Sequence, residues 1–130
     1  MNISWFYRIP NGLRLCAAVG VTLFLTYLLL SSDPWWLARM IPTQAGRDLH
    51  DRLPDWSFHF LAYCGFAFVL MWYGAARPGR VVAMLITFAS SHAVLTEFLQ
   101  RFVPDRTSDP RDLVANFAGI GAGTIGGLIL

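Results

Sequence analysis

Four long apolar stretches without a formal charge constrain this chain more than any other feature. They cover residues 15–32, 56–76, 81–96 and 113–130. About 20 helical residues cross a hydrocarbon core of about 30 Å, and each stretch with its flanks is long enough. Buried helices of a soluble bundle would each carry a polar stripe, whereas these stretches are apolar on nearly all sides. The charged fraction of 14% is also far below the roughly one quarter that is typical of soluble domains.

The stretches therefore predict an all-α polytopic membrane protein, a four-transmembrane-helix bundle in a single domain over residues 1–130. The helices are expected at about 13–31, 56–75, 81–102 and 112–130. Arg8 and Arg14 precede the first stretch as in a signal peptide, but no clear small-residue cleavage site follows it. We therefore expect the first helix to be retained.

The composition argues against several kinds of site. A net charge of +2 and a pI near 8.8 are too mild to indicate a nucleic-acid partner. Cys16 and Cys64 lie within apolar stretches and are expected to be small buried hydrophobes rather than a disulfide or a metal pair. The sequence has no nucleophile elbow, phosphate loop or zinc motif, so we expect neither a metal nor a cofactor.

Polar side chains within or next to the predicted helices form the most informative pattern. Asp55, His59 and Tyr63 recur every four residues and therefore share one helix face. Because consecutive spans alternate in direction, the start of the second helix, the end of the third and the start of the fourth meet at one membrane surface. The polar set that converges there is Asp55, His59, Tyr63, His92, Glu97, Gln100, Arg106, Asp109, Asp112 and Asn116.

Ionisable groups at membrane depth are costly and usually face a bundle interior or a wet cavity, so this set predicts a functional site. Glu97, His59 and Asp112 are candidate catalytic acid–base groups, because imidazole and carboxylate groups exchange protons. The candidate binding residues are Asp55, Tyr63, Gln100, Arg106, Asp109 and Asn116. Since a carboxylate at the membrane edge needs a partner, we expect Glu97 within salt-bridge reach of Arg106 or one water away.

A structural role is the alternative for several of these residues. Interhelical hydrogen bonds also join helices in membranes, at well under about 2 kcal/mol each. For Tyr63, Thr96 and Asn116 joining helices is at least as good an explanation as binding, and the roles of His92 and of the loop 33–55 stay open.

Small residues recur on the last helix, in the pattern Gly119-x-x-x-Gly123-x-x-x-Gly127. Overlapping small-residue motifs of this kind form a groove in which another helix can approach closely. The partner helix is expected either within the bundle or in a second copy, which makes a homo-oligomer through Gly119, Gly123 and Gly127 one candidate assembly.

The distribution of arginine bears on orientation. The N-terminal segment and the turn between the second and third helices carry Arg8, Arg14, Arg77 and Arg80 and no acidic residue, which favours cytoplasmic termini. The two longer loops carry six Arg and seven Asp, so a bare Arg count favours these loops instead. Because most of their arginines lie among carboxylates, we predict that the longer loops face outward.

Three segments carry the polar residues in a characteristic order: DWSFHFLAY at 55–63, EFLQRFVPDRTSD at 97–109 and DLVANFAG at 112–119. Together they resemble the VanZ-like family of small membrane proteins. The family often has a Lys two or more residues before the His, where this chain has Trp56 and Ser57, so that charge partner is missing. The resemblance implies membrane localisation and a link to the cell envelope, and the namesake of the family is associated with resistance to the glycopeptide teicoplanin.

The function favoured by these features is binding of a lipid head group, or of a lipid-linked envelope precursor, at a polar cluster near one leaflet of a bacterial inner membrane. Such binding would contribute to glycopeptide resistance. The rim arginines Arg52, Arg101, Arg106 and Arg111 suit phosphate recognition, because guanidinium pairs bidentately with phosphate. The alternatives are a membrane enzyme acting on such a lipid with Glu97 or His59 as acid–base, a small transporter or flippase subunit, and a purely structural subunit. Whether the protein is an enzyme stays open.

Overall fold

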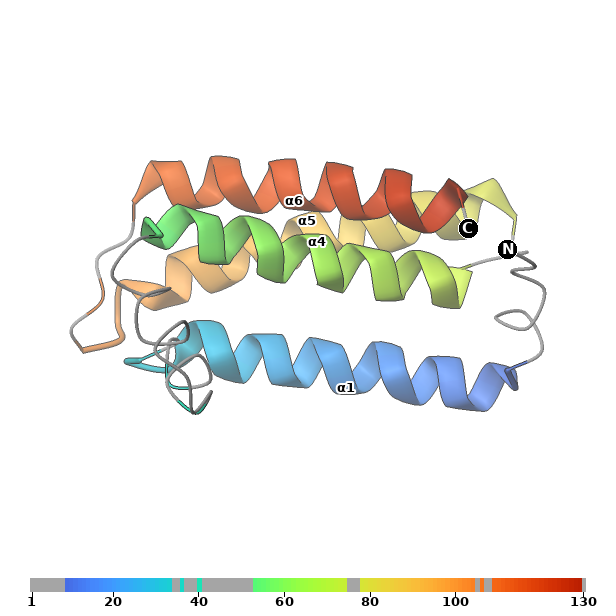
Figure 1. The fold of residues 1–130 in the computed structure, drawn as a ribbon, viewed down its shortest axis with the longest axis horizontal. Helices are drawn as coiled ribbons and strands as arrows, with labels where there is room; N and C mark the ends of the chain where they lie inside the picture. The colour runs from blue at the N-terminus through green and yellow to red at the C-terminus, as the bar shows by residue number, and fades with distance from the viewer. Residues whose placement is uncertain are drawn as a thin grey trace.

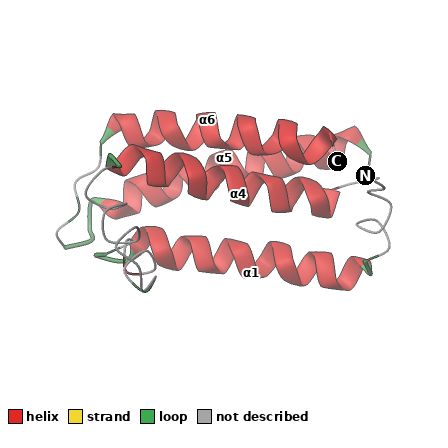
Figure 2. Cartoon of the chain, viewed as in Figure 1, coloured by secondary structure: helices red, strands yellow, loops and turns green. Residues whose placement is uncertain are grey.

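The computed structural model describes residues 9–33, 36, 40, 53–74, 78–104, 106 and 109–129. They form helices α1 (Asn11–Leu30), α4 (Asp55–Gly74), α5 (Gly79–Gln100) and α6 (Pro110–Ile129), and the described residues contain no strand (Figure 2). The predicted all-α fold is confirmed, although each helix begins and ends slightly earlier than expected. All four helices are long and apolar enough to cross a membrane.

A proline stands at the start of every helix. The pyrrolidine ring fixes φ near the helical value, and its missing N–H is not needed in the first turn. Asp55 and Asp112 lie in the first turns of α4 and α6, where a carboxylate faces the positive end of the helix dipole. The prolines are Pro10, Pro54, Pro78 and Pro110.

The helices alternate in direction, so that α1 and α5 end where α4 and α6 begin (Figure 1). In the described residues α4 contacts all three other helices, whereas α1 and α6 do not contact each other. Figure 1 shows α6 and α1 on opposite sides of α4, with α5 behind it. The elements that carry the polar set therefore meet at one end of the bundle.

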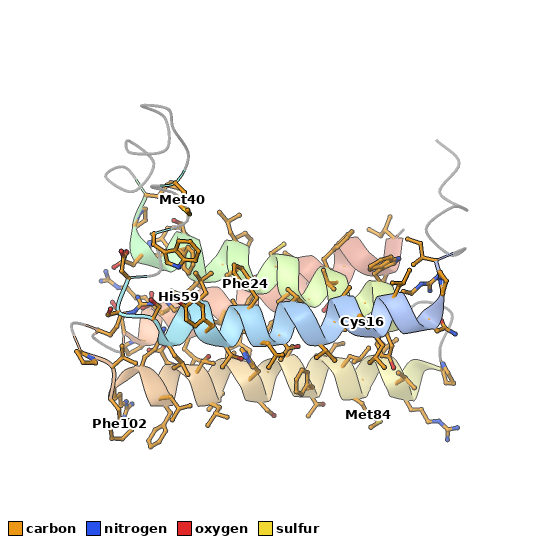
Figure 3. The ribbon with its side chains drawn as sticks, turned by 90° about the horizontal axis from the view of Figure 1, so that it is seen from below. Cys16, Phe24, Met40, His59, Met84 and Phe102 are labelled. Atoms are coloured by element: carbon orange, nitrogen blue, oxygen red, sulfur yellow. The ribbon has the colours of Figure 1, made fainter. Side chains whose placement is uncertain are left out.

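The outer surface of the bundle is apolar and its centre contains polar groups. Met84 and Phe102 project outward (Figure 3) and are 70% and 72% exposed. Tyr63, His59 and Asn116 are instead among the most deeply buried large side chains. The buried core also contains many apolar side chains, so the outer surface is what differs from a soluble fold. An apolar outer surface is what a bundle surrounded by lipid requires.

The glycines of α6 pack against α4 of the same chain. A Cβ atom at Gly119 would overlap the carbonyl oxygen of Phe60, and one at Gly123 would overlap that of Cys64. A Cβ atom at Gly127 would lie 2.5 Å from Cβ of Met71. The groove predicted for these glycines is thus occupied by α4 within the bundle. The homo-oligomer expected through Gly119, Gly123 and Gly127 stays a prediction.

Candidate functional site

The polar residues gather at the end of the bundle where α4 and α6 begin, on the left in Figure 1. Three ionisable side chains are buried there: His59 is 1% exposed, Glu97 6% and Asp112 8%. Neutral polar side chains surround them, and these are Tyr63, Thr96, Gln100 and Asn116. We call His59, Glu97, Gln100, Asp112 and Asn116 the polar cluster.

His59 links α4 to α6 through both of its ring nitrogens. Nδ1 lies 3.1 Å from Oδ1 of Asn116, and Nε2 lies 3.7 Å from Oδ2 of Asp112. Asp112 and Asn116 are four residues apart on α6 and so present both groups to the same imidazole. The sequence had placed all three residues at one membrane surface, and the structure brings them into contact.

The contact between His59 and Asp112 is of ion-pair range rather than a hydrogen bond. Nε2 and Oδ2 lie 3.7 Å apart, beyond hydrogen-bond distance, and the contact is an ion pair only when the imidazole carries both of its protons. The Asn116 amide oxygen accepts from Nδ1, or, with the amide turned over, its NH₂ group donates to Nδ1. The structure therefore places two proton-exchanging groups, an imidazole and a carboxylate, side by side.

Tyr63 and His92 form a second, neutral network one turn deeper. The Tyr63 hydroxyl lies 2.9 Å from Nδ1 of His92 and 2.8 Å from Oγ1 of Thr96. Nε2 of His92 lies 2.8 Å from Oγ1 of Thr26 on α1. The network therefore joins α1, α4 and α5. It shows which residues His92 contacts, whereas the chemical role of His92 stays open.

Gln100 and Arg106 contact the end of α1. Nε2 of Gln100 donates to the carbonyl oxygen of Leu29 at 3.0 Å, and Nη2 of Arg106 donates to the same oxygen at 3.4 Å. The last carbonyls of a helix have no partner within the helix, and a cation there interacts favourably with the negative end of the helix dipole. Both side chains thus cap α1.

Charge connects Arg106 to the cluster at longer range. Burial lowers the pKa of the Arg106 guanidinium, and the carboxylates of Asp55, Asp112 and Glu97 oppose that shift. The hydrogen bond that Arg106 makes is to Leu29 and not to Glu97. Contact between Glu97 and Arg106 through a water stays a prediction.

The rim of the cluster is more open to water. Asp55 is exposed and Asp109 is half-buried. Oδ1 of Asp109 accepts a hydrogen bond of 2.9 Å from the backbone N–H of Arg111, which satisfies a donor of the first turn of α6. The Arg101 guanidinium lies 5.8 Å from the ring centre of Phe98. Arg52 lies outside the described residues.

Comparison with known proteins decides the family. A profile of the VanZ/LLP1 family matches residues 16–130, which is most of the chain and includes the whole polar set. The chain belongs to the VanZ/LLP1 family. No curated protein and no solved structure matches it. The resemblance seen in the sequence is therefore confirmed, and this is a VanZ-like protein with four helices that are long and apolar enough to cross a membrane.

Two residues of α1 contact the polar residues of this VanZ/LLP1 protein, although α1 carries no sequence motif. Thr26 reaches His92, and the Leu29 carbonyl accepts from Gln100 and Arg106. A signal for Thr26 was present, because Thr22 and Thr26 mark one face of an otherwise apolar helix. No signal existed for Leu29, since its contact uses only a backbone oxygen.

The chemistry open to the site is that of protons, hydrogen bonds and charge. In the residues that the structure describes, no three His, Cys, Asp or Glu side chains are grouped so that they could hold a metal ion. His59 and Asp112 are an adjacent imidazole and carboxylate, and the exposed Asp55 and half-buried Asp109 add acceptors at the rim of the cluster. These groups suit a ligand that has both polar atoms and access to the membrane surface.

Proposed function

We propose that this VanZ/LLP1 protein binds the polar head group of a lipid, or of a lipid-linked envelope precursor, at the polar cluster. One observation carries the proposal: three ionisable side chains, His59, Glu97 and Asp112, are buried together at one end of a bundle whose outer surface is apolar. Burying ionisable groups in a membrane costs several kcal/mol unless partners compensate them. Ionisable side chains buried at membrane depth therefore indicate a binding or catalytic site.

Helix joining alone explains the network around Tyr63 better than it explains the polar cluster. Tyr63, His92, Thr26 and Thr96 satisfy one another across three helices, as hydrogen bonds between membrane helices do. Glycine packing already holds α4 and α6 together. A carboxylate at position 97 or 112 adds charge that this packing does not need, and this supports a binding role for the cluster.

A second candidate function has one specific observation in its favour. His59 and Asp112 lie 3.7 Å apart, and an adjacent imidazole and carboxylate can act as a general acid or base. A membrane enzyme acting on a phospholipid or a lipid-linked envelope intermediate would use this pair, with Glu97 beside it. The burial of His59 means that its substrate would have to reach it from the Asp112 side.

Lipid analysis separates the two functions. Bacterial cells with the protein, without it, and with Glu97→Gln would be compared for teicoplanin sensitivity and for membrane lipid composition. Binding predicts a change in sensitivity that depends on Glu97, with an unchanged lipid profile. A lipid species that appears or disappears with the protein would favour the enzyme, and no difference in either measurement would contradict both functions.

We also propose that the protein lies in the inner membrane with both termini in the cytoplasm, so that the polar cluster faces outward. Gly79 has open space around it and Pro104 is exposed at the opposite end of the bundle. With Cys16 and Cys64 replaced, an impermeant thiol reagent should label Pro104→Cys in intact cells and Gly79→Cys only in opened cells. The reverse pattern would overturn this orientation.

A further inference from the structure

An apolar groove runs along the outside of the bundle beside the polar cluster. It lies between the first turns of α4 and α6 and has a volume of about 460 Å³, within the range of about 300–1,000 Å³ that is typical of ligand pockets. The residues that line it are Trp56, Phe60, Pro110, Arg111, Val114, Ala115 and Ala118. Only Arg111 among them is charged.

The groove adjoins the cluster through neighbouring residues of the chain. Trp56 follows the exposed Asp55, and Arg111 precedes the buried Asp112. Trp56 is 48% exposed, and tryptophan favours the level of the lipid head groups. The polar end of the groove is thus at the membrane surface, and its apolar end at Ala118 points into the hydrocarbon region.

Arg111 differs from the other arginines at this end. Arg106 donates to the Leu29 carbonyl oxygen and interacts electrostatically with three carboxylates. Arg101 lies over the ring of Phe98. Among the residues that the structure describes, the Arg111 guanidinium has no hydrogen bond or ion pair, since the contact of this residue is made by its backbone N–H. It is an exposed cation at the mouth of an apolar groove.

We infer that this groove binds a membrane phospholipid, with one acyl chain between α4 and α6 and the phosphate on Arg111. The inference rests on the proposed function and extends it, because it names the ligand class and assigns phosphate recognition to Arg111 among the four rim arginines. A phosphate complements a guanidinium in both charge and shape. An acyl chain complements Phe60, Val114 and Ala118, and the remaining polar atoms of the head group lie toward Asp55 and Asp112.

Photocrosslinking in a maltoside detergent tests the groove without competing phosphate. The probes are phosphatidic acid and diacylglycerol that carry the same photoactivatable acyl chain. Phosphatidic acid should crosslink to the 56–60 and 114–118 segments about tenfold more than diacylglycerol, because only its phosphate reaches Arg111. Arg111→Gln should remove that difference, and Ala118→Trp should abolish crosslinking there by filling the groove.

A matched control lies on another face of the bundle. Val94 lines a second outer groove, between α5 and α6, and Val94→Trp should leave crosslinking at 56–60 unchanged. Equal labelling by both probes on all faces would show ordinary surrounding lipid and would overturn the inference. If the groove is not crosslinked but lipid binding still depends on Asp112, the groove inference is wrong and the proposed function stands. If the groove is crosslinked as expected but Glu97→Gln changes no cellular property, the proposed function is wrong and the groove inference stands.

Discussion

Replacing Gly123 with alanine is expected to destabilise the folded protein severely and to lower its abundance in the membrane. The new Cβ atom would overlap the backbone carbonyl of Cys64, and a backbone atom cannot rotate away as a side chain can. Helices α4 and α6 would have to separate along several turns and lose their close packing. Overpacking of a core costs about 1–3 kcal/mol and occasionally more, and we expect the upper end of that range or beyond, measured as thermal unfolding in detergent.

Gly121→Ala is the control on the same helix. No atom lies within 4 Å of the position where its Cβ would be built, and alanine is favoured over glycine within a helix by about 1 kcal/mol. Its melting temperature should be equal to or above that of the parent. Equal destabilisation by both substitutions would contradict the packing described for α6.

Replacing Glu97 with glutamine is expected to abolish function while the folded protein stays in the membrane. Glutamine keeps the size and most of the hydrogen bonding of glutamate but removes its charge and its exchangeable proton. A helix-joining role would tolerate the change, because a neutral amide still bonds across helices. A binding role that depends on charge would not. Membrane abundance, melting temperature in detergent and teicoplanin sensitivity should be measured together.

Thr96→Val provides the opposite pattern within the same part of the bundle. Valine keeps the branched shape and removes the hydroxyl that meets Tyr63. The melting temperature should fall by the equivalent of about 1 kcal/mol or less, and sensitivity should stay that of the parent. If Glu97→Gln behaves like Thr96→Val, the polar cluster joins helices and nothing more.

The sequence predicted the fold well because the bilayer leaves few choices. A charge-free stretch of about 20 residues can only cross as a helix when no barrel pattern is present, so α4 and α6 could be placed to within a few residues. The convergence of His59 with Asp112 followed from alternating spans and a spacing of four. The glycines of α6 predicted close packing against another helix. The sequence could not predict which helix, since a surface of small residues fits α4 and a helix of a second copy equally well.

The sequence could not predict contacts that depend on how each helix is rotated about its axis and on how deep each residue lies in the bundle. Glu97 was expected within salt-bridge reach of Arg106 or one water away, because a lone carboxylate there would be costly. The sequence did not predict that the Arg106 side chain donates to the Leu29 carbonyl, since the end of a helix offers unsatisfied oxygens that no side-chain pattern records. The contact of Arg106 with Glu97 through a water stays a prediction. The distinct position of Arg111 also required the structure, because the groove beside it is completed by Trp56 and Phe60 of α4.

Native mass spectrometry of the protein released from membranes in mild detergent tests the central claim most directly. Asp112 lies 3.7 Å from His59 in the polar cluster, and Asp112→Asn keeps its size while removing its charge. The parent should retain a lipid of defined mass and stoichiometry, and Asp112→Asn should lose that lipid while keeping the melting temperature of the parent to within a few degrees. A parent that carries no lipid, or a variant that carries the same lipid in the same proportion, would contradict the account.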